Sequence, residues 1–366
     1  MIRLIWFVLV LYFFSFEINA QEIRRPKNII LLIGDGMGLN YVAADILGDQ
    51  NSPFKKFTTV GLSITKSVDK LITDSAAAAT AIATGYPTKN HHISVDSSHN
   101  NLYTIFELAR KKGLSTGIVV TDDVTGGTPA PFFAHITSRY KRFDIAKQFI
   151  NSNLDIVIGG GANNFLQFSS GSTKPGKVNI MNALVSNGYE FYYDFKSLSK
   201  SLSSEKIFGL LAKGSLPIAS KREYTLGNLT AIALNNLNAN KDGFILMVEG
   251  SQIDWAGHDT NYVYLLSELE DFSTAVSTAL EFAQKDKNTL VIVTADHETG
   301  GMTITDGTHT ADSLKIEFIN TRHTAGFVGV FATGPGEDIF KGIYDNYMIG
   351  RKIFFLLDDS FEYPFN

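Results

Sequence analysis

The chain has 366 residues, of which 44% are hydrophobic and 19% are charged. These values are typical of a globular protein rather than a disordered one, and the length suffices for one large α/β domain or two ordinary ones. The formal net charge of −5 offers no basic surface for nucleic acid. The chain has no cysteine, which excludes disulfides, lipid-modified cysteine and thiolate metal ligands. A tightly bound metal ion would therefore need His, Asp, Glu or hydroxyl oxygen as ligands.

The N-terminal segment has the pattern of an export signal. Arg3 precedes an apolar run from Leu4 to Phe16, and the small residue Ala20 would be the last before cleavage. A run of about 13 apolar residues is too short to span a bilayer comfortably. We expect residues 1–20 to be removed, with a periplasmic or secreted product that keeps no stable membrane span. An uncleaved anchor is the alternative.

Apolar, β-branched runs alternate with helical patterns along the rest of the chain, which is typical of a mostly parallel sheet covered on both faces. In chain order, we expect a strand at Asn28–Ile33, helices at Asp74–Thr84 and Leu102–Lys111, a strand at Ser115–Thr121, a helix at Phe143–Asn151, strands at Asp155–Ile158 and Phe244–Val248, a helix at Tyr262–Gln284, and strands at Thr289–Thr294 and Phe327–Ala332. The predicted fold class is α/β, as a three-layer α/β/α sandwich. Because no repeat or linker divides the chain, we predict a single domain over residues 21–366.

The segment at about 165–222 interrupts this alternation. Ser and Lys are frequent there, as in SLSKSLSSEK at 197–206, and the strand pattern fades. We interpret the segment as an insertion on the main sheet that could shape the approach to a site. A plain surface excursion is an equal alternative.

The residues that follow the predicted strands are unusually polar. In an open α/β sheet, ligands bind beyond the carboxyl ends of the strands. GDGMG at 34–38, EGSQIDWAGH at 249–258 and DHETGG at 296–301 each lie at the end of a strand. The first of these is not a dinucleotide-binding fingerprint, because Leu39 stands where the third small residue is required. An acid beside close-approach glycines suits a metal carboxylate better.

Carboxylates and histidines at these strand ends favour a metal site. Asp254 and His258 are four residues apart, so on a helical turn they would share one face. Asp296 and His297 are adjacent and could also meet at one ion. Either pair alone could equally be a surface ion pair or a satisfied histidine. Several crowded carboxylates, however, repel one another unless a divalent cation such as zinc, magnesium, manganese or cobalt lies between them.

Ser75 stands directly before an alanine-rich helical run. A helix cap is the plain interpretation of such a hydroxyl. Two cations about 4 Å apart would form a clamp for displacement at phosphorus. Beside such a cation, a serine at a helix N-terminus would lose its proton readily and would face a phosphate held by backbone N–H groups. Arg139 has a planar fork that matches two phosphate oxygens.

The sequence resembles the alkaline phosphatase family over roughly Lys27 to Pro335. The motifs that carry the resemblance are GDGMG (34–38), TDSAAAATAIATG (73–85), TPAPFFAHITSR (128–139), VEGSQIDWAGH (248–258), TADHETGG (294–301) and HTAGF (323–327). The resemblance implies a metal-dependent enzyme that hydrolyses small phosphate monoesters of many kinds to inorganic phosphate and an alcohol. Whether such a chain forms a homodimer stays open.

The resemblance also implies a role for each matching residue. Ser75 would be the nucleophile that forms a phosphoserine, and Arg139 would bind the substrate's phosphate. The implied ligands are Asp254, His258 and His323 for one Zn²⁺; Asp35, Asp296 and His297, with Ser75 as the fourth, for a second Zn²⁺; and Asp35, Thr128 and Glu249 for one Mg²⁺. The residues left without a catalytic role are Asp74, His91, His92, His99, His135 and His309.

Two positions depart from the family pattern. Gly126 stands where members commonly have an Asp or His that supports the magnesium site, and Trp255 stands where a Lys or His often reaches the phosphate through water. Residues outside the direct ligand set usually tune a site, so we expect altered magnesium affinity, phosphate binding and pH profile rather than a lost reaction.

Other functions remain open on the sequence alone. A sulfatase needs x-Pro-x-Arg after its nucleophile, whereas alanines follow Ser75. A phosphodiesterase or a metal-dependent mutase could share the fold and the paired cations. An inactive relative that only binds phosphate or metal is an alternative of another class, because fold alone does not give function.

Overall fold

The structure is a computed structural model and describes residues 23–165, 179–201, 206–308, 310 and 313–361. The predicted export signal at 1–20 and His309 lie outside these residues. Among the described helices, none combines the length and the apolar character needed to cross a membrane.

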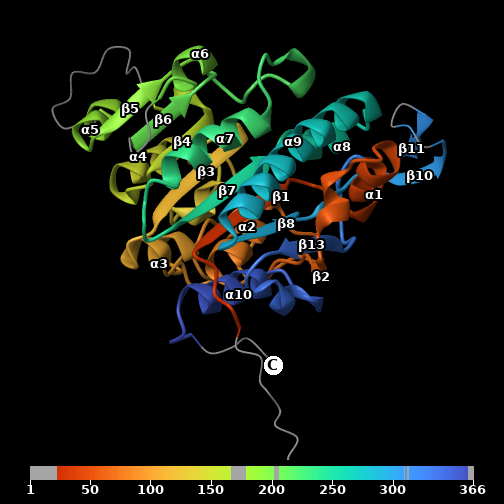
Figure 1. Ribbon diagram of the computed structural model, residues 1–366, viewed down its shortest axis with the longest axis horizontal. Helices are drawn as coiled ribbons and strands as arrows, with labels where there is room; N and C mark the ends of the chain where they lie inside the picture. The colour runs from red at the N-terminus through yellow and green to blue at the C-terminus, as the bar shows by residue number, and fades with distance from the viewer. Residues whose placement is uncertain (1–22, 166–178, 202–205, 309, 311–312, 362–366) are drawn as a thin grey trace, which may run out of the picture.

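A ten-stranded sheet crosses the molecule in the order β14-β2-β13-β8-β1-β7-β3-β4-β6-β5 (Figure 1). Its strands are β1 (Asn28–Gly34), β2 (Thr59–Ile64), β3 (Ser115–Asp123), β4 (Ile156–Gly160), β5 (Tyr189–Tyr192), β6 (Lys206–Leu210), β7 (Phe244–Gly250), β8 (Thr289–Thr294), β13 (Val328–Thr333) and β14 (Gly342–Asp345). The pairings are parallel except that β13 runs opposite to both of its neighbours, β2 and β8. The sheet is therefore mostly parallel, as predicted.

The central strands form because they are buried on both faces. All residues of β1, β7 and β8 are buried, as expected of near-continuous apolar runs in a parallel sheet. Side chains alternate along β1: Ile29 and Leu31 pack into one hydrophobic core, and Ile30 and Leu32 pack into another. The sheet thus separates two cores, one on each face.

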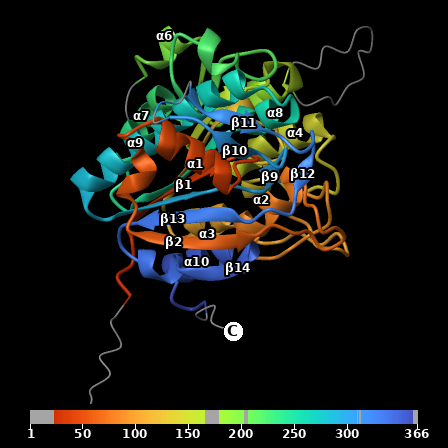
Figure 2. The same ribbon diagram turned by 90° about the vertical axis from the view of Figure 1, so that its right-hand side faces the viewer.

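Helices cover both faces of the sheet. One core includes residues of α2 (Ser75–Thr84), α3 (Ile105–Lys111), α4 (Arg142–Ser152), α5 (Ile180–Ser186) and α10 (Tyr347–Leu357). The other core includes residues of α1 (Leu39–Gly48), α6 (Phe195–Leu198), α7 (Leu226–Leu237), α8 (Gln252–His258) and α9 (Tyr262–Asp286). Figure 2 shows α1 on one side of β13 and β2, with α10 on the other. This arrangement confirms the predicted three-layer α/β/α class.

The region at about 165–222 differs from the expectation. β6 pairs in parallel with β4, and β5 pairs in parallel with β6, so two strands of this region extend the main sheet. The weak sequence pattern there did not reveal these two strands. The two strands are short, and β5 at the sheet edge is only partly buried, so neither has a long apolar run. That the segment is an insertion, and that the chain is one domain, stay predictions.

Candidate active site

The polar segments singled out in the sequence meet at one edge of the sheet. β1, β7 and β8 run in parallel, so Asp35, Glu249 and Asp296 all come at their carboxyl ends. β13 runs the other way, and His323 therefore reaches the same edge although it precedes its strand. The rule that sites follow parallel strands would have missed this histidine.

Ser75 is the first residue of α2 and is buried, with 4% of its surface exposed. The helix cap is Asp74, whose Oδ1 accepts a hydrogen bond from the N–H of Ala77 at 3.0 Å. Interpreting Ser75 itself as the cap is therefore wrong. Its Oγ instead lies 3.3 Å from Nε2 of His297. The serine oxygen is thus free of the helix backbone and next to the histidine cluster.

The first group of metal-type ligands consists of Asp254, His258 and His323. Asp254 and His258 share one face of α8, as their spacing predicts, with Oδ2 and Nε2 3.2 Å apart. Nε2 of His323 lies 3.5 Å from Oδ1 of Asp254 and 3.1 Å from Nε2 of His258. One carboxylate and two imidazole nitrogens therefore converge on a single point.

Backbone carbonyls orient two of these rings. Nδ1 of His258 lies 2.7 Å from the carbonyl oxygen of Thr321, and Nδ1 of His323 lies 2.9 Å from that of Thr73. A carbonyl oxygen only accepts, so both Nδ1 atoms donate, and in the neutral rings both Nε2 atoms carry lone pairs. Two such lone pairs that face each other at 3.1 Å need a proton or a metal ion between them. Such outer contacts are typical of metal-binding histidines.

The second group brings Asp35, Asp254 and His297 together. Nε2 of His297 lies 3.4 Å from Oδ1 of Asp35 and 3.3 Å from Oδ2 of Asp296. The resemblance implied Asp296 here and placed Asp254 in the first group only. The structure places Asp254 within reach of both groups, with Asp296 beside the second.

Several carboxylate oxygens at this edge are buried without a partner. Within the described part of the chain, Oδ1 of Asp35, Oδ2 of Asp296 and Oε2 of Glu249 accept no hydrogen bond. Burial, followed by mutual repulsion, raises the pKa of Asp35 well above its usual value, and burial raises the pKa of Asp296 to about 6. Buried carboxylates of this kind need protons or cations. The donor set fits divalent metal ions.

The pKa values of two histidines in the cluster are shifted in opposite directions. The hydrogen bond with Asp254 raises the pKa of His258 to about 9. Burial, with the charge of His323 adding to it, lowers the pKa of His297 well below its usual value. Burial alone would raise the pKa of Asp254, but the hydrogen bond with His258 and the neighbouring imidazoles lower it. His297 is thus a neutral ligand, and a metal ion would compete with a proton at His258.

The residues implied for a third cation also lie together. Oγ1 of Thr128 is 3.5 Å from Oδ2 of Asp35. Burial raises the pKa of Glu249 well above its usual value, partly offset by hydrogen bonds from the hydroxyls of Thr128 and Ser251. The hydroxyl of Thr128 therefore contacts both acids.

Arg139 is held by Asp74, a residue that the sequence resemblance left without a catalytic role. Its Nη1 lies 3.0 Å from Oδ2 of Asp74, which also accepts the N–H of His91 on its other oxygen. The backbone of Gly127 passes so close that a Cβ there would lie 2.2 Å from Nη2 of Arg139. Asp74 therefore caps α2 and positions the guanidinium. A favoured cap residue just before Ser75 was the signal that could have found it.

The remaining described histidines lie apart from the two groups. His135 makes a 3.1 Å contact with Glu107 and a 2.9 Å contact with the carbonyl of Ser94. The rings of His92 and His99 contact each other. His91 borders the site, since its Nδ1 lies 3.1 Å from Oδ2 of Asp74.

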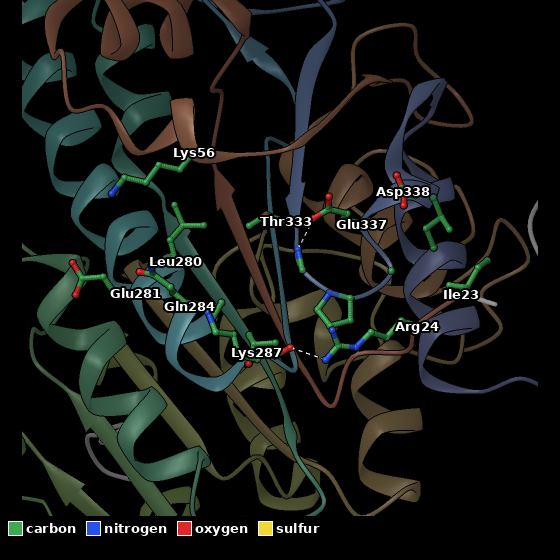
Figure 3. A pocket seen from close by; sticks show the side chains of 16 residues that line it. Ile23, Arg24, Lys56, Leu280, Glu281, Gln284, Lys287, Thr333, Glu337 and Asp338 are labelled. Carbon is green, nitrogen blue, oxygen red and sulfur yellow. Dashed lines mark hydrogen bonds between the residues drawn. The ribbon is translucent and has the colours of Figure 1, made fainter. Parts of the chain in front are cut away.

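A separate pocket lies at the amino end of β8. It has a volume of about 1090 Å³ and is lined by residues such as Arg24, Lys56, Glu281, Lys287 and Glu337 (Figure 3). None of the residues proposed for catalysis or metal binding lines it. The polar cluster and the large pocket are separate features.

Fold and site together define an α/β protein with a cluster of metal-type ligands beside a serine at a helix N-terminus. The sequence model of the alkaline phosphatase family matches residues 26–317. Alkaline phosphatase 3 of Bacillus subtilis is 40% identical over 311 residues, which cover 79% of this chain and 65% of that protein. The chain belongs to the alkaline phosphatase family, although it spans slightly less than two thirds of that relative's length.

Solved structures agree with this assignment. Alkaline phosphatase from the Antarctic bacterium TAB5 has a TM-score of 0.84 and 35% identity, covering 93% of this chain and 100% of that one. A variant of the TAB5 enzyme with Mg²⁺ bound in a site called M3 has a TM-score of 0.83, 36% identity and the same coverage.

Proposed function

We propose that this protein is an alkaline phosphatase that hydrolyses small phosphate monoesters through a phosphoserine on Ser75. The observation that carries the proposal is the 3.3 Å separation of the Ser75 oxygen from Nε2 of His297, at the N-terminus of a buried helix. Family membership supports the reaction class, and the residue roles are our inference.

In this mechanism, the oxygen of Ser75 attacks phosphorus, and the bond from phosphorus to the alcohol oxygen breaks. The alcohol leaves with a proton, balancing the proton that Ser75 gave up. Water then attacks phosphorus, and inorganic phosphate leaves as Ser75 regains its hydroxyl. The first turn of α2 stabilises the phosphoryl oxygens, because free N–H groups and the positive end of the helix dipole lie there.

Arg139 binds two phosphoryl oxygens through its planar guanidinium. Burial would lower its pKa, but the charge of Asp74 outweighs this and raises it, so Arg139 stays charged. Because Asp74 holds Nη1, the arginine is oriented before substrate arrives, which reduces the entropy lost on binding. These contacts hold the phosphoryl group and leave the alcohol free, so substrates of many kinds would be accepted.

The buried ligands would hold three cations. Asp254, His258 and His323 would bind one Zn²⁺, and Asp35, Asp296, His297 and the oxygen of Ser75 would bind a second. Asp35, Thr128 and Glu249 would bind Mg²⁺. When bound, such ions lower the pKa of a coordinated hydroxyl or water and stabilise the charge on the leaving alkoxide.

The test is trapping of the covalent intermediate. The parent protein and Ser75→Ala are incubated with radiolabelled phosphate at low pH, and the label on protein is counted after denaturation. We expect label on the parent alone, equal metal content in both proteins, and loss of monoester turnover after chelation. Label on Ser75→Ala would refute the nucleophile assignment.

A second assay separates this function from its nearest rival. Hydrolysis of a phosphate monoester and of a diester with the same leaving group is compared in the parent protein. We expect the monoester to be the far better substrate, because Arg139 and the third cation suit a dianionic phosphoryl group. Faster hydrolysis of the diester would mean that the protein is a phosphodiesterase rather than a phosphatase. Export to the periplasm or outside the cell stays a prediction, and the oligomeric state stays open.

A further inference from the structure

Gly126 lies two residues before Thr128, a proposed ligand of Mg²⁺, and a carboxylate from another position fills the space beside it. A Cβ built on Gly126 would lie 2.8 Å from Oδ2 of Asp122, which is closer than such atoms approach. The oxygen of Asp122 thus occupies the space that a side chain at 126 would enter. Family members commonly have an acid or histidine at that position.

Asp122 is fixed in this orientation from two sides. Its Oδ1 accepts a hydrogen bond from the hydroxyl of Ser215 at 2.6 Å, and its backbone N–H donates to the hydroxyl of Ser251 at 3.0 Å. These contacts leave Oδ2 facing Gly126. A carboxylate held this way needs little further ordering when a ligand arrives.

Asp122 also interacts with the third cation's proposed ligands. The hydroxyl of Ser251 bonds to the carboxylate of Glu249, so Asp122 and Glu249 share a hydrogen-bonding partner. Oε2 of Glu249 is buried and, among the described residues, has no hydrogen-bond partner. Ser251 therefore links Asp122 to a proposed magnesium ligand that still has an acceptor oxygen to offer.

We propose that Asp122 replaces the side chain missing at position 126 and strengthens Mg²⁺ binding at Asp35, Thr128 and Glu249. It is a positioning residue outside the three proposed ligands, and it supplies negative charge and an acceptor oxygen at the wall of the site. This inference rests on the magnesium site proposed above. It explains how the chain can lack the usual residue at 126 and keep the site.

The experiment measures Mg²⁺ binding directly. Metal-free protein is reloaded with Zn²⁺ and titrated with Mg²⁺ by calorimetry, for the parent, Asp122→Asn and the control Asp144→Asn on the exposed side of α4. Asn at 122 keeps an acceptor for Ser215 and removes the charge. We expect the Mg²⁺ dissociation constant of Asp122→Asn to rise about 10- to 100-fold, as for other residues that support metal ligands. The control should match the parent.

A second variant separates metal binding from folding. Ser215→Ala keeps the charge of Asp122 but removes its hydrogen bond, and we expect a smaller loss, of about threefold, at an unchanged melting temperature of the Zn²⁺-loaded, Mg²⁺-free protein. Unchanged Mg²⁺ affinity in Asp122→Asn overturns the role of Asp122 alone. A parent protein that takes up no Mg²⁺ beside its Zn²⁺ overturns both this role and the third cation site.

Discussion

The pocket at the amino end of β8 and the polar cluster at the carboxyl edge of the sheet differ in how their charges are satisfied. At the amino end of β8, Arg24 donates to the carbonyl of Lys287 and to Asn288, and Glu337 accepts from Thr58 and from the N–H of Gly334 (Figure 3). At the carboxyl edge, buried oxygens of Asp35, Asp296 and Glu249 have no such partner among the described residues. Unsatisfied buried charge, rather than cavity volume, therefore indicates where the chemistry occurs.

The largest expected effect distinguishes the polar cluster from the pocket at the amino end of β8. Asp254→Asn should reduce kcat/KM for a phosphate monoester about 10³-fold, or about 4 kcal/mol, because Asp254 contacts both ligand groups. The variant should also lose zinc, as measured by mass spectrometry. Glu281→Gln, the matched change at the large pocket, should leave both values unchanged. Comparable losses of kcat/KM and zinc in the two variants would show that the pocket at the amino end of β8 contributes as much as the polar cluster.

The second prediction concerns how the stability of the metal-free protein depends on pH through the buried carboxylate of Asp296. The folded-state pKa of Asp296 is about 6, above its usual 3.8, so the folded metal-free protein binds this proton more tightly than the unfolded chain does. Stability should therefore fall as pH rises from about 4 through 6. At pH 8, metal-free Asp296→Asn should be more stable than the metal-free parent by on the order of 2–3 kcal/mol, and at pH 4 the two should agree.

Urea unfolding of metal-free protein at the two pH values measures this difference. Added Zn²⁺ should reverse the order at pH 8, since only the parent keeps the ligand. The same pH slope in both proteins would mean that Asp296 is satisfied without a metal.

The third prediction concerns Asp74. Asp74→Asn loses a charge-assisted hydrogen bond to Arg139 but keeps an oxygen that can cap α2. We expect KM for a monoester and the inhibition constant for phosphate to rise about tenfold, with a smaller change in kcat. Steady-state kinetics checks this. A purely structural role would instead lower the melting temperature and leave the phosphate affinity intact.

The smallest effect belongs to His135 and Glu107, a partly buried pair whose charges satisfy each other. Burial opposes both shifts, yet the contact between His135 and Glu107 raises the pKa of His135 and lowers that of Glu107. Glu107 stabilises only above its unfolded pKa and His135 only below its own, so the pair stabilises the protein between about pH 5 and 6.

Glu107→Gln should therefore cost about 1 kcal/mol at pH 5.5 and less at pH 9, with unchanged kcat. Urea unfolding at the two pH values measures the cost. An equal cost at both would show that the charge of His135 contributes nothing.

The sequence predicted the centre of the fold better than its edges. The strand at Thr289–Thr294 is found with the expected bounds, because a strand buried on both faces is a near-continuous apolar run. β2 and β14 carry exposed positions, and β5 is only four residues long. Strands at or next to the two edges of the sheet, such as these, lack the continuous apolar run on which the sequence prediction depends.

Some residues of the site could also be predicted from the sequence, and others could not. Acids and histidines after parallel strands could be found from order and spacing, and Asp254 with His258 lies on one helical face as predicted. His323 could not be placed by that rule, because β13 runs antiparallel. The contribution of Asp122 depends on where a loop brings Gly126, which no local pattern encodes.

The central claim is that paired cations flank the oxygen of Ser75 at the carboxyl edge of the sheet. Crystals of the parent protein grown with zinc, measured on both sides of the zinc absorption edge, test it most directly. We predict two anomalous peaks, one among Asp254, His258 and His323 and one among Asp35, Asp296, His297 and the oxygen of Ser75. Peaks only at other positions, or none beside Ser75, would contradict the account.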